Sequence, residues 1–218
     1  RVLFRSADAL KEAEKKLKSI GNVFSIKADI SKEEDRKNIF DIIENKWNRL
    51  DILVNNAGTN IRKPTLEYFC EELDMLMQLN YSSVLEMSRL AFPLLKKSDF
   101  PSILNIGSIA GSRVVRTGAA YAGAKAGTAH LTRYLAAEWG PENIRVNCIE
   151  PWYIRTPLTE PVLNDKDKLK KIKEITPLGR TGEAEEIAGI AAFLSMPSAS
   201  YISGQVIAVD GAASVLMF

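Results

Sequence analysis

The sequence predicts an α/β fold in which a doubly wound parallel sheet carries helices on both faces. Segments with helical periodicity alternate with short apolar runs along the chain, which is typical of parallel sheets. Four of these runs show little polar alternation, as expected for strands that are covered on both faces. The 218 residues, 46% of them hydrophobic, are enough for one hydrophobic core, and the length requires no second domain.

The first elements are predicted from helix start and stop signals. Residues 7–20 form an amphipathic pattern that Gly21 ends, and residues 22–28 are predicted to form a strand. Ser31, with Glu34 three positions later, has the pattern of a capping box. We therefore expect the second helix to begin after Ser31 and to run toward Trp47.

The remaining elements follow the same alternation. The four apolar runs expected to form the central sheet are 51–55, 103–107, 145–149 and 205–209. The predicted long helical segments are 66–98, 119–139 and 183–196. Residues 151–181 are less regular and rich in proline, threonine and charge, so we interpret them as an insertion or lid.

Composition argues against several classes of partner. The formal net charge is only +2, and acidic residues accompany the lysines, so we expect no nucleic-acid groove. No apolar run is long enough to cross a bilayer, and the first residues lack a secretory pattern, so we expect a soluble cytoplasmic protein without membrane contact. Cys70 and Cys148 lie far apart without metal-ligand spacing. We expect no metal, and a buried free thiol at Cys148.

Small and polar residues follow the predicted strands. Asn55-Asn56-Ala57-Gly58 follows the first run, Gly107-Ser108 the second, and Glu150-Pro151-Trp152 the third. In an open parallel sheet, ligands bind in the crevice beyond the carboxyl ends of the strands. Glycine and alanine allow a flat ligand to approach, and asparagines can hold a loop through backbone hydrogen bonds. Alone, the Asn-Asn-Ala-Gly stretch also fits an ordinary turn.

Tyr121 and Lys125 are four residues apart in a helical segment, so their side chains share one face. An isolated tyrosine titrates near ~10, but a neighbouring cation favours the phenolate and lowers its pKa. Such a pair can perform acid–base chemistry. Without context, the same spacing is more often a surface pair.

The context resembles the short-chain dehydrogenase/reductase family from about Leu10 onward. The matching features are Asp29, the segment 51–58, Asn80, Ser108, Tyr121-Ala-Gly-Ala-Lys125, the segments 144–147 and 151–157, and the segment 201–211. Within that family, the stretches PWYIRTPLTEP, AFPLLK and SYISGQVI are most similar to the tropinone reductase-like branch. The resemblance implies a Rossmann-like fold and an oxidoreductase that transfers hydride between a nicotinamide and a carbonyl or alcohol substrate.

The resemblance also implies residue roles. Tyr121 would be the general acid or base, and Lys125 would bind the nicotinamide ribose and lower the pKa of Tyr121. Ser108 would bind the substrate oxygen, and Asn80 would hold a water that relays protons. The other implied cofactor-binding residues are Asp29, Asn56, Ala57, Gly58, Pro151, Ile154 and Thr156. For Asp29, a turn that precedes a helix is the alternative interpretation.

The beginning of the chain departs from the family. The first strand, the glycine-rich turn and the following helix are missing from this sequence, so we expect a fold that lacks the first βα unit and weak binding of the dinucleotide. Residues 2–4 could end a second strand. Residues 1–6 (RVLFRS) match a reading frame of a sequencing adapter, and we interpret them as an artefact that precedes a single domain over 7–218.

Fewer residues of the sequence bear on cofactor preference and on the substrate. Arg5 has the register to contact a ribose 2′-phosphate, and the subfamily resemblance favours NADP(H) over NAD(H). Residues 112–118 and 152–175 should line the substrate pocket, where Trp152 would form a bulky wall. Gly118 offers no carboxylate to an amine, so tropinone itself is not expected. His130 falls on another helical face than Lys125 and is interpreted as structural.

Two other functions are compatible with this pattern. A 3-oxoacyl-carrier-protein reductase would share the catalytic residues, and a catalytically silent dinucleotide-binding protein would keep the fold. The resemblance implies a homotetramer. Ala212 occupies a place where the family usually has a second glycine after Val-Asp-Gly, a change from which we predict nothing.

Overall fold

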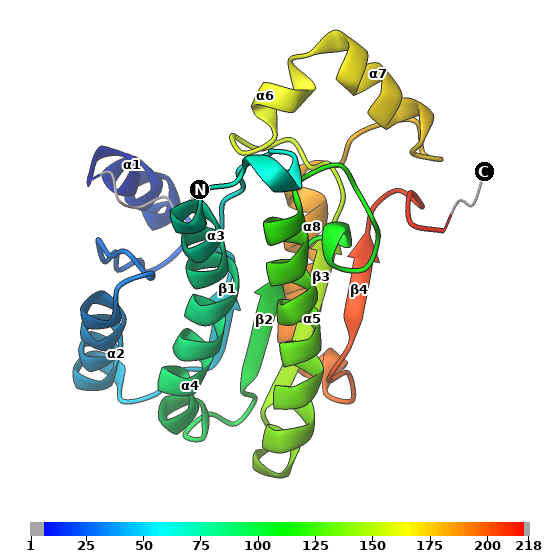
Figure 1. The fold of residues 1–218 in the computed structure, drawn as a ribbon. Coiled ribbons are helices and arrows are strands. Elements are labelled where there is room, and N and C mark those ends of the chain that lie inside the picture. Colours follow the sequence, from blue (N-terminus) through cyan, green and yellow to red (C-terminus); the bar gives the residue numbers. More distant parts are fainter. Residues whose placement is uncertain (1–6, 216–218) are drawn as a thin grey trace.

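A parallel sheet lies at the centre of the computed structural model, which describes residues 7–215 (Figure 1). Its four strands pair in the order β1-β2-β3-β4. Their bounds are β1 Ile52–Asn55, β2 Ser102–Ile106, β3 Arg145–Pro151 and β4 Val206–Val209. Each strand lies within two residues of its predicted bounds, which confirms the α/β fold with a parallel sheet.

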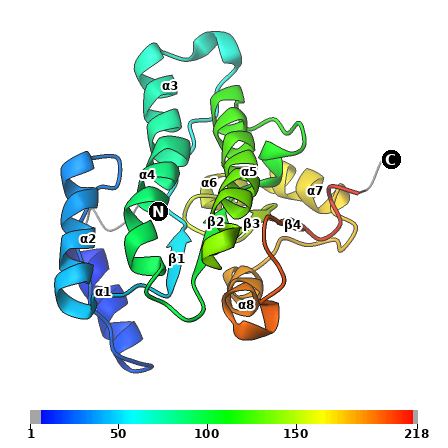
Figure 2. The same ribbon diagram turned by 90° about the horizontal axis from the view of Figure 1, so that it is seen from below.

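Helices cover both faces of the sheet (Figure 2). On one face, α4 (Ser83–Leu95) and α5 (Ala119–Trp139) pack against strand residues that include Leu53, Ile103 and Val146. On the other face, α8 (Ala184–Ser195) packs against Leu104 and Ile149. These two apolar layers hold the carboxyl ends of all four strands at one edge of the molecule.

Strands β1 and β4 differ from the expectation that all four strands are covered on both faces, since no residue of β4 is fully buried. Leu53 and Asn55 are buried beneath α4, but Ile52 is 42% exposed and Val54 is 48% exposed. The reason is the position of α8, which packs mainly against β2 and β3. A strand with alternating exposure is therefore compatible with an apolar run of four residues.

The segment 22–28, which was predicted to form a strand, is not one. It connects α1 (Ala7–Lys18) to α2 (Glu33–Trp47) without a strand partner among residues 7–215. Its apolar side chains pack against α2 instead. The centroid of the Phe24 ring lies 5.8 Å from that of Trp47 in an edge-on arrangement, and the Lys46 ammonium lies over the Phe24 ring. A strand requires a neighbouring strand to pair with, and apolar composition alone cannot supply one.

The capping box predicted at Ser31 is also wrong. Helix α2 begins at Glu33 after Lys32, whose side chain makes no capping hydrogen bond. The Ser31 hydroxyl instead donates to Oδ1 of Asp29 at 2.7 Å. The Asp29 carboxylate accepts from both the amide and the hydroxyl of Ser31, so Ser31 lies in a turn that precedes the helix. The acidic first turn of α2 complements the positive end of the helix dipole.

The predicted helical segment 66–98 is interrupted. It consists of a 3-10 helix (Thr65–Glu67), α3 (Cys70–Met77), a π-helical turn (Gln78–Ser82) and α4. Helix α5 begins and ends where it was predicted, and α8 does so within one residue. Shorter 3-10 helices are Ile109–Gly111, Gly140–Glu142 and Pro197–Ala199.

The irregular segment 151–181 contains two short helices, α6 (Glu160–Leu163) and α7 (Lys166–Glu174). Both lie beyond the carboxyl ends of the strands, at the top of Figure 1. Their position agrees with the interpretation of this segment as an insertion over the crevice.

Cys148 is a buried free thiol, as expected, and Cys70 is free and exposed. Burial raises the pKa of the Cys148 thiol to about 12, so the thiol is protonated at neutral pH. Among residues 7–215, no helix combines the length and the apolar character that crossing a membrane requires. Residues 1–6, which include Arg5 and the proposed strand end, lie outside the described residues.

Candidate active site

A cavity of about 450 Å³ opens at the carboxyl ends of the strands. It brings together all four residues predicted to be catalytic, which are Asn80, Ser108, Tyr121 and Lys125. Five of the predicted cofactor-binding residues also line it, namely Asn56, Gly58, Pro151, Ile154 and Thr156. The loops after β1, β2 and β3 thus meet at one place, as the topology of a parallel sheet predicts.

Two predicted cofactor-binding residues do not line this cavity. Ala57 lies between two lining residues but is not itself part of the wall. Asp29 lies in the turn before α2, where its carboxylate accepts from the backbone amide and hydroxyl of Ser31 and its own amide donates to Asp35. This geometry matches the alternative interpretation of Asp29 as a turn residue, and an adenine contact stays a prediction.

Tyr121 lies in the first turn of α5, partly exposed to the cavity. Burial raises the pKa of its phenol, while a hydrogen bond with Ser108 and the positive charge of Arg62 act in the opposite direction. The net direction is opposite to the lowering expected from Lys125. The physical reason is that removal of the phenolate from water outweighs these favourable contacts.

Lys125 is 4% exposed, one helical turn after Tyr121. Its Nζ donates to the carbonyl oxygen of Ile106 at 2.7 Å and lies 5.7 Å from the centroid of the Tyr121 ring. Burial lowers the pKa of this ammonium group to about 8. The amine therefore changes its charge close to neutral pH, which suits a group that takes part in proton transfer.

Asn80 is fully buried in the π-helical turn between α3 and α4. Its Nδ2 donates to the carbonyl oxygens of Thr59 and Leu76, and its own backbone carbonyl accepts from Thr128. Without the extra residue of the π turn, the side chain would point elsewhere, and such turns occur often at functional sites. The turn therefore directs Asn80 to the loop that follows β1.

Gly58 makes the close approach of this loop possible. A Cβ at this position would lie 2.8 Å from Oδ1 of Asn80 and 3.6 Å from Nζ of Lys125. Only a residue without a side chain leaves these two polar groups facing the same space. That space is part of the cavity.

The turn that carries Ser108 is held from two sides. The Ser108 hydroxyl accepts from the backbone amide of Ala110 at 3.2 Å at the start of a 3-10 helix. After that helix, Ser112 donates to Oε2 of Glu150 at 2.7 Å. Glu150 is 2% exposed, and burial raises the pKa of its carboxyl group.

Asn55, the first asparagine of the Asn-Asn-Ala-Gly stretch, holds β1 through side chains and not through backbone groups as expected. Its Nδ2 donates to Ser88 of α4 and to Asn105 of β2, and Asn105 in turn donates to Thr132 of α5. This buried network fixes the spacing of two strands and two helices directly below the cavity.

Comparisons with known proteins identify the family. A family model described as enoyl-(acyl carrier protein) reductase matches residues 2–213. A tropinone reductase homolog from Arabidopsis thaliana is 48% identical over 77% of this chain. The chain belongs to the short-chain dehydrogenase/reductase family. The alignment covers 63% of the Arabidopsis protein, so the chain spans less than two thirds of that relative.

Solved structures of this family share the fold. A putative gluconate dehydrogenase from Agrobacterium tumefaciens superposes with a TM-score of 0.93 at 29% identity, covering 97% of this chain and 84% of that one. The NADP complex of RhlG from Pseudomonas aeruginosa superposes with a TM-score of 0.90 at 34% identity, covering 95% of this chain and 83% of that one. These likenesses agree with the Rossmann-like fold predicted from sequence.

Part of the remaining cavity wall in this short-chain dehydrogenase/reductase comes from the two segments that were predicted to line the substrate pocket. Val115 and Thr117 represent the segment 112–118, and the segment 152–159 contributes several residues, including Trp152. Trp152 donates from Nε1 to Thr176 at 3.1 Å, which holds the indole in place as a bulky wall. Residues 160–175 do not line the cavity.

Sequence reasoning missed several lining residues. These are Val54, Asn60, Arg62, Ile106, Ala110 and four residues of α8, Ala184, Ile187, Ala188 and Ala191. The signal that could have found Asn60 and Arg62 is their place in the loop directly after the predicted first strand. The α8 residues carry no such signal, because apolar helix residues that line a cavity look like core residues. His130 is exposed and does not line the cavity.

Proposed function

We propose that the protein is an oxidoreductase in which Tyr121 exchanges a proton with a carbonyl or alcohol substrate, with NADP(H) as the redox partner. The observation that carries this proposal is the convergence of Ser108, Tyr121, Lys125 and Asn80 on one cavity, although they come from three separate parts of the chain: the turn after β2, helix α5 and the π-helical turn. Family membership supports the reaction class. Because the chain covers part of its relatives, this activity is proposed for the protein to which it belongs.

Each side chain has a role that follows from its position. The Tyr121 phenol gives its proton to the substrate oxygen in the reducing direction and takes it back in the other. Ser108, which hydrogen-bonds the phenol, holds the same substrate oxygen. Lys125, whose charge changes near pH 8, supplies the proton through the buried space that it shares with Asn80. Proton transfer of this kind contributes roughly 10²- to 10⁴-fold in rate.

The cavity residues fit the nicotinamide end of a dinucleotide. Gly58 leaves open a space bordered by Asn80 and Lys125, and Ile154 and Thr156 lie on the opposite loop. When bound, the nicotinamide supplies or accepts the hydride. Preference for NADP(H) is supported by the NADP complex of RhlG, a structural neighbour. The residues that would contact the pyrophosphate were not found in this sequence, so weak binding by this chain alone stays a prediction.

The test is oxidation of NADPH and of NADH in the presence of a panel of aldehydes and ketones. We expect Tyr121→Phe to lower kcat by roughly 10²-fold or more, because the general acid is removed. Tyr134→Phe is the matched control, since Tyr134 lies on the same helix but is 62% exposed and outside the cavity. Full activity of Tyr121→Phe would refute the mechanism.

A second candidate is reduction of the 3-oxo group of an acyl chain that is bound to an acyl carrier protein as a thioester. It is favoured by the description of the matching family model and by the five lysines of α7, which lies over the crevice. Carrier proteins of this kind would approach a basic surface. Activity on an acyl-carrier thioester without activity on free ketones would favour this candidate over the first.

A catalytically silent dinucleotide-binding protein is the alternative that is not an enzyme. NADPH turnover with any carbonyl substrate would exclude it.

We also propose that the protein forms a homotetramer, which analytical ultracentrifugation would test. A cytoplasmic location is proposed too, although one Arabidopsis relative is described as chloroplastic, and fluorescent tagging of the protein would decide between the two.

A further inference from the structure

The loop of residues 59–63 enters the cavity after β1 and is held at four of its five residues. The backbone of Thr59 exchanges hydrogen bonds with the side chain of Asn80. Asn60 donates from Nδ2 to the carbonyl and hydroxyl oxygens of Thr117, at 3.0 and 2.6 Å. The loop therefore has one defined path along the cavity wall.

The other two contacts flank Arg62. The carbonyl oxygen of Ile61 accepts from the hydroxyl of Tyr68 at 2.5 Å. On the far side, Lys63 forms an ion pair with Glu72 at 2.7 Å. The backbone on both sides of Arg62 is thus anchored, and this residue is placed without having to hold the loop itself.

Arg62 is exposed, lines the cavity, and makes no hydrogen bond or ion pair with another described residue. Its guanidinium is close enough to Tyr121 for its charge to favour the phenolate. The only other charged residue in the described wall is Lys125, which points to the carbonyl of Ile106. The described wall includes no aspartate or glutamate. The cavity therefore presents an unpaired cation and no compensating carboxylate.

We propose that Arg62 binds a carboxylate of the substrate, so that the protein acts on oxo acids or hydroxy acids. This inference rests on the proposed oxidoreductase function and names its substrate class. A guanidinium on an anchored backbone binds a carboxylate through two parallel hydrogen bonds, and preorganisation lowers the entropic cost of that contact. The apolar side chains of Trp152, Val115 and Leu158 cover the carbon chain between the carboxylate and the reacting carbonyl.

The experiment compares oxo acids with their methyl esters, which keep the carbonyl but lose the charge. Pyruvate, acetoacetate and levulinate place the carboxylate at increasing distance from the carbonyl. For the best member of the series, we expect the wild type to favour the acid over its ester by about 10-fold or more in kcat/KM. Arg62→Met should lower kcat/KM for the acid by about 10- to 100-fold and leave the ester within about 3-fold, while Arg62→Lys should keep part of the preference.

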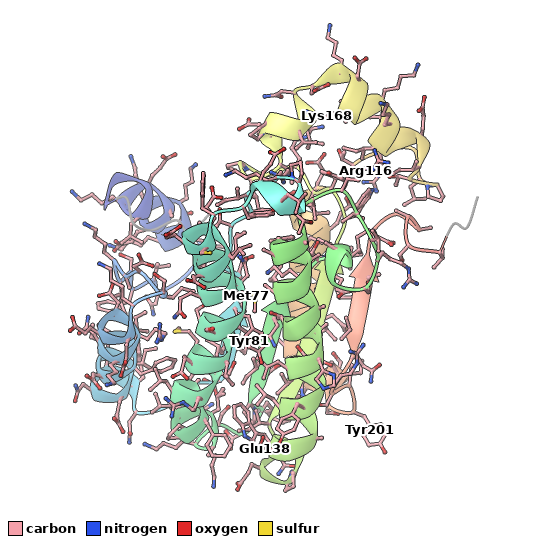
Figure 3. All side chains as sticks on the ribbon, viewed as in Figure 1. Met77, Tyr81, Arg116, Glu138, Lys168 and Tyr201 are labelled. Atoms are coloured by element: carbon pink, nitrogen blue, oxygen red, sulfur yellow. The ribbon has the colours of Figure 1, made fainter. Side chains whose placement is uncertain are left out.

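Arg116→Met is the matched control. Arg116 is an exposed arginine at the same end of the molecule as Lys168 of α7 (Figure 3), and it does not line the cavity. We expect its removal to leave the acid-to-ester ratio unchanged. An equal loss in Arg116→Met would mean that the general positive field, and not Arg62, selects the acid, and would overturn the proposal.

Two further outcomes are decisive. If Arg62→Met lowered activity on acid and ester alike and raised the KM for NADPH, the guanidinium would bind a phosphate of the cofactor, and the proposal would be wrong. If no acid or ester were reduced, the oxidoreductase function would fail, and calorimetry would then decide the Arg62 proposal separately. Levulinate should bind the wild type but not Arg62→Met, and methyl levulinate should bind neither; equal affinities for both ligands would overturn it.

Discussion

The Nζ of Lys125 donates a hydrogen bond to the carbonyl oxygen of Ile106 at 2.7 Å, and this contact ties α5 to the carboxyl end of β2. The ammonium group has no carboxylate beside it in the cavity wall, so burial is not compensated by an ion pair. Its pKa consequently falls to about 8. The buried position that supports the proposed role of Lys125 in proton transfer therefore also makes this residue costly for stability.

The pH dependence of stability should reveal this cost. Between the folded pKa of about 8 and the ordinary value of 10.5, the unfolded chain binds a proton that the folded chain has released, so the contribution of Lys125 to stability rises with pH. We expect the unfolding free energy of the wild type to increase relative to that of Lys125→Met by about 1–3 kcal/mol from about pH 8 to about pH 10. Urea denaturation of both proteins measures this difference.

Cys148 has the opposite effect on the pH dependence of stability in the upper part of the same pH range. Its folded pKa of about 12 lies above the ordinary value of 9.0, so the folded chain keeps a proton that the unfolded chain loses. Cys148→Ser removes this contribution, so above about pH 9 the unfolding free energy of that variant should rise more steeply with pH than that of the wild type. A constant difference between wild type and Lys125→Met across the window would contradict a buried ammonium group.

Glu150 should limit stability at neutral pH. Only Oε2 of its buried carboxyl group has a partner, Ser112, while Oε1 accepts no hydrogen bond from the described residues. Because its folded pKa is raised above 4.5, stability is highest below that pH and falls as pH rises through the folded pKa. We expect Glu150→Gln to gain about 1 kcal/mol at pH 7, with the gain vanishing below about pH 4.5.

Urea denaturation at both pH values measures the effect of Glu150→Gln. Glu138→Gln, a change at an exposed residue of α5, is the control and should show little difference. A loss of stability in Glu150→Gln at pH 7 would show that the ionised carboxylate, and not the neutral acid, is held by the turn after Ser108.

Two glycines near the site should respond to alanine in opposite ways. A Cβ on Gly111 would lie 2.8 Å from backbone atoms of Lys125 and Ala126, whereas a Cβ on Gly123 of α5 would meet nothing within 4 Å. We expect Gly111→Ala to lose about 2 kcal/mol or more, because the turn must move away from α5. Gly123→Ala should gain about 0.5–1 kcal/mol from helix propensity. Thermal unfolding of the two variants is the measurement, and equal effects would argue against the close packing of turn and helix.

Ala212 occupies a backbone conformation that favours glycine. Its φ is 70°, directly after Gly211 at 62°, and its amide donates to the Asp210 carboxylate. The left-handed region costs a residue with a Cβ about 1 kcal/mol relative to glycine. We expect Ala212→Gly to raise the melting temperature by about 2–4 °C for a chain of this size. Ala213→Gly is the control, because φ at Ala213 is not positive, and it should give no increase.

The sequence carried the local signals of this fold. Apolar runs and helical periodicity predicted all four strands and the bounds of α5, because residue preference and spacing act over a few neighbouring residues. The same signals failed for the segment 22–28, since a strand depends on a partner that local sequence does not specify. They also failed for Ser31, because this residue lies in a turn with Asp29 and the helix begins only at Glu33.

The catalytic candidates Ser108, Tyr121 and Lys125 were determined by the sequence alone. Their spacing relative to predicted strands matches a known family, and the carboxyl ends of parallel strands meet at one edge. Only the tertiary structure decided their electrostatics, because a pKa depends on burial and on neighbours that come from distant segments. For the same reason, the raised pKa of Tyr121, the amine of Lys125 directed at Ile106 and the unpaired guanidinium of Arg62 could not be deduced from residue order.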